Sequence, residues 1–70
     1  MKNNWIPCSE RLPEEVNGES KAVLAIVRHV DFDGLVYSEN YQIVWRENGE
    51  WACRGRVIAW MPLPEPYEEN

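Results

Sequence analysis

The stretch Lys21-Ala22-Val23-Leu24-Ala25-Ile26-Val27-Arg28-His29-Val30 is the most apolar part of this chain, and we expect the fold to be built around it. Valine and isoleucine recur along it, and apolar residues occupy both faces of the extended chain. This pattern is typical of a strand that is covered on both sides. A helix is the alternative, but the stretch has no strong N-cap and too many valines. We therefore predict a central β-strand.

Further along the chain, an apolar segment and the turn residues Glu47-Asn48-Gly49 predict a β-hairpin. If the loop has three residues, Trp45 faces Trp51 and Arg46 faces Glu50 across the two strands. A two-residue Asn-Gly turn is the alternative, and it would put the two tryptophans on opposite faces. We predict the three-residue loop, because it separates apolar from polar side chains. The apolar face of this hairpin is then Tyr41, Ile43, Trp45, Trp51 and Cys53.

Short turn signals divide the rest of the chain. Asn17-Gly18 and residues 31–34 read as turns, and residues 35–37 as a short strand or a packed loop. Gly55 marks a predicted bulge, because Trp60 would otherwise fall on the polar face. We therefore expect a mainly β fold: a small antiparallel sheet of three to five strands with a central hairpin and proline-rich arms at both ends. Helix is limited to one or two short turns.

Tryptophan and proline occur together at both ends, in Trp5-Ile6-Pro7 and in residues 60–66. Proline removes a backbone donor, so neither end can be an ordinary helix or an interior strand. Residues 8–15 can begin with one helical turn capped by Ser9, which Pro13 prevents from extending. A bulky ring beside rigid backbone suggests that these ends are anchored on the sheet. The expected structural anchors are Trp5, Pro7, Leu12, Pro13, Trp45, Trp51, Trp60, Pro62 and Pro64.

Length and charge restrict the class of protein. Seventy residues allow a single small domain, residues 1–70, and the net charge is −5. This charge disfavours nonspecific binding to nucleic acids or to anionic membranes. No signal peptide and no apolar run of membrane-spanning length is evident. We therefore expect a cytoplasmic protein whose two cysteines, Cys8 and Cys53, are reduced thiols.

The residues needed for catalysis or metal binding are sparse. His29 is the one histidine, and together with Cys8 and Cys53 it supplies three zinc ligands without the usual local spacing. Residues 31–34 resemble the start of a calcium loop, but the later ligands of such a loop are missing. No phosphate loop, nucleophile elbow or dinucleotide fingerprint occurs. We therefore expect no enzymatic activity, no catalytic residue, no metal and no cofactor.

The two end motifs also resemble those of a known family. Residues 5–14, WIPCSERLPE, and residues 60–66, WMPLPEP, are similar to the signatures of a small domain-of-unknown-function family from tailed phages and prophages of enterobacteria. The resemblance covers nearly the whole chain. It departs from the family at Ala59, where a histidine is usual, and in residues 31–39, which are longer. The resemblance implies a phage or prophage setting in a bacterial host, and it implies no catalytic residue.

These observations lead to several functional hypotheses. The first is a non-enzymatic phage accessory protein that binds a protein partner of the host, one form of which is an inhibitor of a host defence protein. The alternative is a structural or assembly domain, in particular a homodimer. Binding of nucleic acid through the arginines is disfavoured by the net charge. The polar residues read most simply as solvated surface; as candidate partner-binding residues we name Arg46, Arg54, Arg56, Glu10, Glu14 and Glu15.

Overall fold

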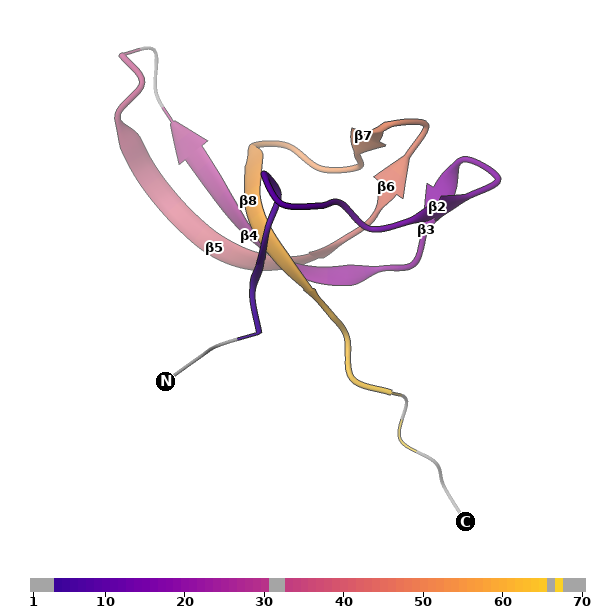
Figure 1. Ribbon diagram of the computed structural model, residues 1–70. Coiled ribbons are helices and arrows are strands. Elements are labelled where there is room, and N and C mark those ends of the chain that lie inside the picture. The colour runs from indigo at the N-terminus through magenta and orange to yellow at the C-terminus, as the bar shows by residue number, and fades with distance from the viewer. Residues whose placement is uncertain (1–3, 31–32, 66, 68–70) are drawn as a thin grey trace.

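The computed structural model describes residues 4–30, 33–65 and 67, and these residues form strands and turns without any helix (Figure 1). The mainly β prediction is therefore confirmed, although two antiparallel sheets of four strands occur where one sheet was expected. Of the expected turns and end residues, Asp31, Phe32, Pro66, Glu68 and Glu69 lie outside the described residues. The strands are β1 (Ile6–Pro7), β2 (Glu15–Val16), β3 (Glu19–Ser20), β4 (Val23–Val30), β5 (Val36–Val44), β6 (Arg46–Glu47), β7 (Glu50–Trp51) and β8 (Arg56–Pro62).

The large sheet has the strand order β1-β8-β4-β5 and contains the three longest strands. The predicted central strand is confirmed as β4, which pairs with β5 on one side and with β8 on the other. The expectation that both of its faces are covered is wrong, since only alternate residues of β4 are buried. Residues 35–37 were expected as a short strand or a packed loop, and Val36 in fact begins β5. In Figure 1, β5 curves so that the chain beyond it folds back over one face of this sheet.

The small sheet has the order β2-β3-β6-β7 and consists of two hairpins with the same type of turn. Asn17 and Gly18 have φ values of 56° and 83°, and Asn48 and Gly49 have values of 51° and 83°. Positive φ at both central residues defines the two-residue type I′ turn, for which Asn-Gly is the favoured sequence. The Asn17-Gly18 prediction is therefore confirmed.

The predicted three-residue loop at residues 47–49 is wrong. Arg46 pairs with Trp51 and Glu47 pairs with Glu50, so the loop consists of Asn48 and Gly49 alone. Because the side-chain period of a strand is two, this difference of one residue reverses the face on which each side chain lies. The two-residue turn prevails because it twists in the same sense as the strands it connects.

The two hairpins also contact each other at their turns. The backbone N–H of Asn48 donates to the carbonyl of Gly18 at 2.8 Å. The N–H of Arg46 donates to the hydroxyl of buried Ser20 at 2.8 Å, and this hydroxyl donates to the carbonyl of Lys21. These bonds satisfy backbone groups on both hairpins and hold them together as one sheet.

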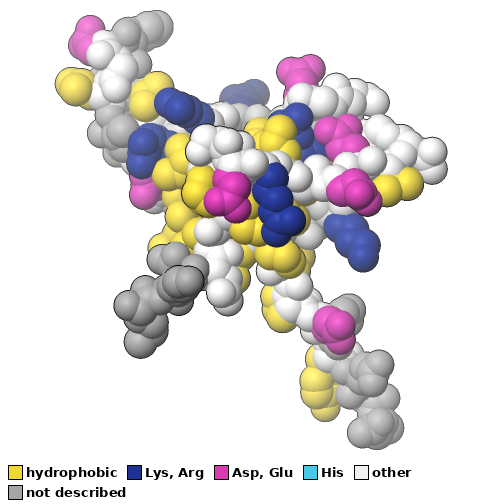
Figure 2. Space-filling view, in the orientation of Figure 1, with side chains coloured by type: hydrophobic (Ala, Val, Ile, Leu, Met, Phe, Trp, Pro, Cys, Tyr) yellow, Lys and Arg dark blue, Asp and Glu magenta, His cyan; other side chains and the backbone are white. Residues whose placement is uncertain are grey.

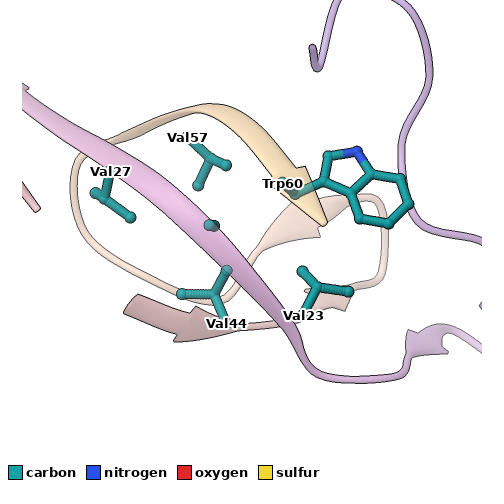
Figure 3. Close-up of a cluster of buried hydrophobic side chains, with 6 residues drawn as sticks. Val23, Val27, Val44, Val57 and Trp60 are labelled. Atoms are coloured by element: carbon teal, nitrogen blue, oxygen red, sulfur yellow. The ribbon is translucent and has the colours of Figure 1, made fainter. Parts of the chain in front are cut away.

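The core lies on one face of the large sheet, which we call the core face. Val23, Ala25 and Val27 alternate along β4 and are at most 4% exposed. Figure 3 shows how residues of the neighbouring strands complete the cluster. These neighbours are Val44 on β5 and Val57 and Trp60 on β8, while Ile6, Cys8, Trp51 and Cys53 pack around them half-buried. Apart from Trp60, every buried core side chain is small, so this ring dominates the core.

A bulge in β8 places Trp60 in this core. Val57 pairs with Val27 and Ala59 pairs with Ile26, which leaves Ile58 as the extra residue. The sequence analysis expected a bulge that turns Trp60 to the apolar face, and such a bulge is present. It was expected at Gly55, however, three residues before its position at Ile58. Gly55 instead precedes the strand with a φ of 90°, packed so closely against β4 that no side chain fits there.

The apolar face predicted for the hairpin is also wrong in β5. Tyr41 and Ile43 are 70% and 61% exposed, whereas Val44, which the prediction placed on the polar face, is 2% exposed. The reason lies in the pairing of Val44 with Val23, which puts Val44 on the core face. Tyr41 and Ile43 therefore lie on the opposite face of the large sheet.

Candidate protein-binding surfaces

The face of the large sheet opposite the core, which we call the outer face, is apolar over three adjacent strands. Directly opposed residues in an antiparallel sheet point to the same side, so the strand pairings define its rows. One row is Met61, Leu24 and Ile43, and the next is Ala59, Ile26 and Tyr41. Period-two alternation predicts polar residues on a solvated face. These two rows contain none.

The outer face is only partly covered by the protein itself. Leu24, Ile26, Ala59 and Met61 are half-buried, and Tyr41 and Ile43 are mostly exposed. The ring of Trp5, which precedes β1, stacks on Tyr41 with centroids 5.8 Å apart and an interplanar angle of 28°. Trp5 thus connects the two opposite edges of the sheet. Contiguous apolar surface of this kind marks an interaction site more often than isolated exposed residues do.

A charged row bounds the outer face at one end. Arg28 pairs with Arg56 on β8 and with Glu39 on β5. The Nε atom of Arg28 donates to Glu39 at 2.9 Å, and both side chains are more than a third exposed. The guanidinium of Arg56 has no carboxylate partner among the described residues. Of the sequence candidates, Arg56 therefore lies at the border of the apolar face.

Arg46 and Glu15, two other candidates, are engaged within the fold. The Nη2 atom of Arg46 donates to the carbonyl of Gly49 at 2.7 Å, and its guanidinium carbon lies 5.3 Å from the centroid of Trp51. Glu15 accepts the N–H of Gly49 at 3.1 Å and lies 3.5 Å from the Nε of Arg46. That nitrogen is buried without a hydrogen bond, so charge attraction alone joins the pair. Both residues stabilise the small sheet.

The remaining candidates, Arg54, Glu10 and Glu14, are exposed. Glu14 is one of the residues that line an open groove of about 640 Å³ between the body of the protein and residues 62–65. Pro13, Trp60, Pro62, Leu63 and Pro64 contribute to its apolar lining. This groove is where the two end motifs meet, and it is a concave surface, separate from the outer face, that a partner could contact.

The sequence analysis missed a row of carboxylates on the small sheet. Glu19 is directly opposite Glu47, and Glu47 is directly opposite Glu50. All three side chains are exposed, and Figure 2 shows acidic side chains gathered over this part of the molecule. Like charges in opposed positions destabilise a sheet. The row could have been found from the two-residue turn, which alone places Glu47 opposite Glu50.

The expected anchors differ in how deeply they are buried. Trp60 and Pro13 are buried, and Trp5 and Trp51 are half-buried. The exposed members of the set are Pro7, Leu12, Trp45, Pro62 and Pro64. Trp60 and Pro13 are therefore the members whose side chains belong to the interior.

No thiol or metal chemistry is favoured in the described part of the chain. Burial raises the pKa of the Cys8 thiol, an effect that Arg46 and Arg56 partly oppose, and burial also raises the pKa of Cys53. A raised pKa keeps a thiol protonated and unreactive at neutral pH. Among the described residues, no three potential ligands gather as a metal site would require. These residues also include no helix with the length and hydropathy needed to cross a membrane.

Comparison with known proteins places the chain in a family but assigns it no activity. Searches of the curated proteins and of the solved structures found no match. A family model described as "Protein of unknown function (DUF551)" matches residues 4–68, which is nearly the whole chain. The chain therefore belongs to this uncharacterised family, DUF551.

Proposed function

We propose that this protein is a non-enzymatic protein-binding module and that its outer face contacts the partner. The observation that supports the proposal most strongly is the exposure of Tyr41 and Ile43, at 70% and 61%, on the edge strand of an apolar sheet face. Burying such side chains gives about 1.5–3 kcal/mol each, which is the main driving force of protein association. An exposed apolar face that does not serve the protein's own core suits this role.

The charges around the outer face suggest the chemistry of the partner. Arg56 and Arg28 border the apolar rows, and one carboxylate, Glu39, accompanies them. A partner surface with an apolar centre and an acidic group at its margin would match this arrangement. The carboxylate row on the small sheet would disfavour an acidic partner there, which would help to orient the complex.

The biological setting that we propose is a phage or prophage accessory protein acting in the cytoplasm of a bacterial host. The resemblance of the end motifs, residues 5–14 and 60–66, supports this setting. Inhibition of a host defence protein is one form of the proposed binding role. The small size and the net charge of −5 support that form, since an acidic protein can block a basic groove.

Capture of partners from lysate of the bacterial host tests the proposal. The tagged wild-type protein is compared with the double variant Tyr41→Ser/Ile43→Thr, and captured proteins are identified by mass spectrometry. A matched control is Tyr67→Ser/Val16→Thr, which changes side chains of similar type that are 89% and 63% exposed and belong to neither row of the outer face. We expect a stoichiometric partner with wild type and control but not with the outer-face variant.

Dissociation constants measured with the captured partner then test whether the outer face is the binding surface. Loss of two apolar contacts of about 1.5 kcal/mol each corresponds to a weakening of more than 100-fold for Tyr41→Ser/Ile43→Thr. Unchanged affinity of this variant would contradict the outer-face proposal. Equal loss in both double variants would do the same, because the effect would then not be specific to the outer face.

A further inference from the structure

The free edges of the two sheets differ greatly in length. β1, at one edge of the large sheet, has two residues, and one of them is Pro7. β2 and β7, at the edges of the small sheet, also have two residues each. β5, at the other edge of the large sheet, has nine residues and no proline. Among the described residues no strand pairs with its outward side, which Figure 1 shows at the margin of the molecule.

Natural proteins normally protect sheet edges, because unpaired N–H and C=O groups recruit other strands. Short length and proline protect three edges of this protein, whereas β5 shows neither feature. Glu39 is the one charged residue in the strand, and its carboxylate is drawn to Arg28. The pairing with β4 is irregular at Tyr37, near the start of β5, but residues 38–44 form a regular edge without proline. A regular edge of this length is best explained by a partner strand.

We propose that the partner strand is β5 of a second copy of this chain, paired antiparallel across a two-fold axis at Asn40. Two-fold symmetric dimers are the commonest protein oligomers, and their interfaces must be self-complementary. An axis at Asn40, the middle residue of β5, pairs residues 38–42 of the two copies and leaves out the irregularity at Tyr37. The pairing would form about four to six backbone hydrogen bonds and would join the two large sheets into one continuous sheet.

The sequence of β5 is complementary to itself in this register. Asn40 would lie opposite its own symmetry mate, where two side-chain amides can donate to each other. Ser38 would lie opposite Gln42, which pairs a hydroxyl with an amide. Glu39 would lie opposite Tyr41, whose hydroxyl can donate to the carboxylate. No like charges are opposed, in contrast to an axis at Glu39, which would put two carboxylates together.

This dimer goes beyond the proposed function and shares with it only the β5 margin of the outer face, where Tyr41 and Ile43 lie. Edge pairing uses backbone groups in the plane of the sheet and leaves the outer face open. It would also place the two copies of Tyr41 and Ile43 on one continuous face. A partner would then meet twice the apolar area that a single copy offers.

Two matched substitutions test the dimer by analytical ultracentrifugation over a range of protein concentrations. Asn40→Asp places two carboxylates opposite each other at the axis, and we expect the dimer to weaken about fivefold or more. Gln42→Glu makes the same change of charge but faces Ser38, and we expect a smaller effect. A wild-type protein that stays monomeric at high concentration would overturn the proposal, as would equal effects of the two variants.

Cysteine cross-linking then tests the register. Directly opposed residues in an antiparallel pair have Cα atoms about 4.5–5.5 Å apart, which a disulfide can bridge. Asn40→Cys should therefore give a covalent dimer under mild oxidation, and wild type should not. Gln42→Cys is the control, because its two copies would lie about 13 Å apart along the strands. Cross-linking of Gln42→Cys in place of Asn40→Cys would overturn the proposed axis.

The outcomes also separate this inference from the proposed function. A monomer that still captures a host protein through Tyr41 and Ile43 would overturn the dimer and leave the binding module intact. Hydrogen exchange at the backbone amides of residues 38–42 adds a further check. We expect their protection from exchange to rise with protein concentration. Protection that appears only when another protein is added would show that a different protein pairs with β5, and would overturn the proposed dimer.

Discussion

The indole N–H of Trp60 donates to the backbone carbonyl of Arg11 at 3.0 Å, across 49 positions of the chain. The guanidinium carbon of Arg11 lies 5.8 Å from the centroid of the same ring, in a cation–π contact. Trp60 therefore buries its ring in the core and also attaches the first end motif to the last strand. This relationship explains how two motifs at opposite ends of the chain contribute to one structure.

Truncation of Trp60 should destabilise the protein severely. We expect Trp60→Ala to lower the free energy of unfolding by about 3–5 kcal/mol, because it removes the largest buried side chain of a small core. Trp60→Phe retains much of the apolar area but leaves the Arg11 carbonyl without its donor, and should cost about 1–2 kcal/mol. Urea denaturation followed by circular dichroism measures both. An unchanged melting temperature for Trp60→Ala would contradict the anchoring role.

Truncation of two neighbouring residues of β5 should destabilise the protein to different extents. Val44 is 2% exposed, and we expect Val44→Ala to cost about 2 kcal/mol through lost burial and a cavity. Ile43 is 61% exposed, and Ile43→Ala should cost less than about 1 kcal/mol. Thermal melts of the two variants compare them directly. A larger loss of stability for Ile43→Ala than for Val44→Ala would contradict this assignment and favour the face that the sequence analysis predicted for Ile43.

The two ion pairs of the fold should differ in value. Arg46→Ala removes a charged hydrogen bond to Gly49, a contact with Trp51 and the attraction to Glu15, and we expect a loss of about 1.5–3 kcal/mol. Arg28→Ala is the control, since its pair with Glu39 is exposed and is worth about 0–1 kcal/mol. Chemical denaturation gives both values. Equal losses would show that Arg46 is not an internal part of the small sheet.

Glycine should be required at position 55 for packing as well as for backbone conformation. A Cβ atom at Gly55 would lie 2.8 Å from Val27 Cγ1 and from His29 Cε1, at a φ of 90°. We expect Gly55→Ala to cost about 2–4 kcal/mol. Gly49 has a similar φ of 83° and open space around it, so Gly49→Ala should cost about 1–2 kcal/mol. The difference between the two melting temperatures isolates the packing term, and no difference would refute it.

The half-buried thiol of Cys8 should make stability depend on alkaline pH. Because burial raises its pKa above 9.0 in the folded state, the folded protein holds this proton more tightly than the unfolded chain does. The resulting stabilisation is complete below pH 9 and is lost as the pH rises through the folded pKa. Urea denaturation between pH 7 and pH 10 should therefore show a steeper decline for wild type than for Cys8→Ala. Parallel curves would contradict the assignment.

Several local features were predictable because they depend on a few neighbouring residues. The valine-rich run predicted β4, and Asn17-Gly18 predicted a turn that is now confirmed. The hairpin was also predicted, but its loop was one residue too long, which reversed the faces of β5. The outer face followed from neither pattern. Its position depends on the pairing of Val44 with Val23, and that pairing involves strands from different parts of the chain.

The sequence by itself determined the β class, the positions of the tight turns and the proline that shortens β1. These properties follow from the backbone angles that valine, glycine, asparagine and proline allow, and such preferences act within a few residues. The tertiary structure alone decided which side of β5 is buried, where β8 bulges, and that Arg46 is held by Glu15. Those outcomes depend on how distant segments pack against one another, because both faces of β5 carry apolar residues and local preference cannot choose between them.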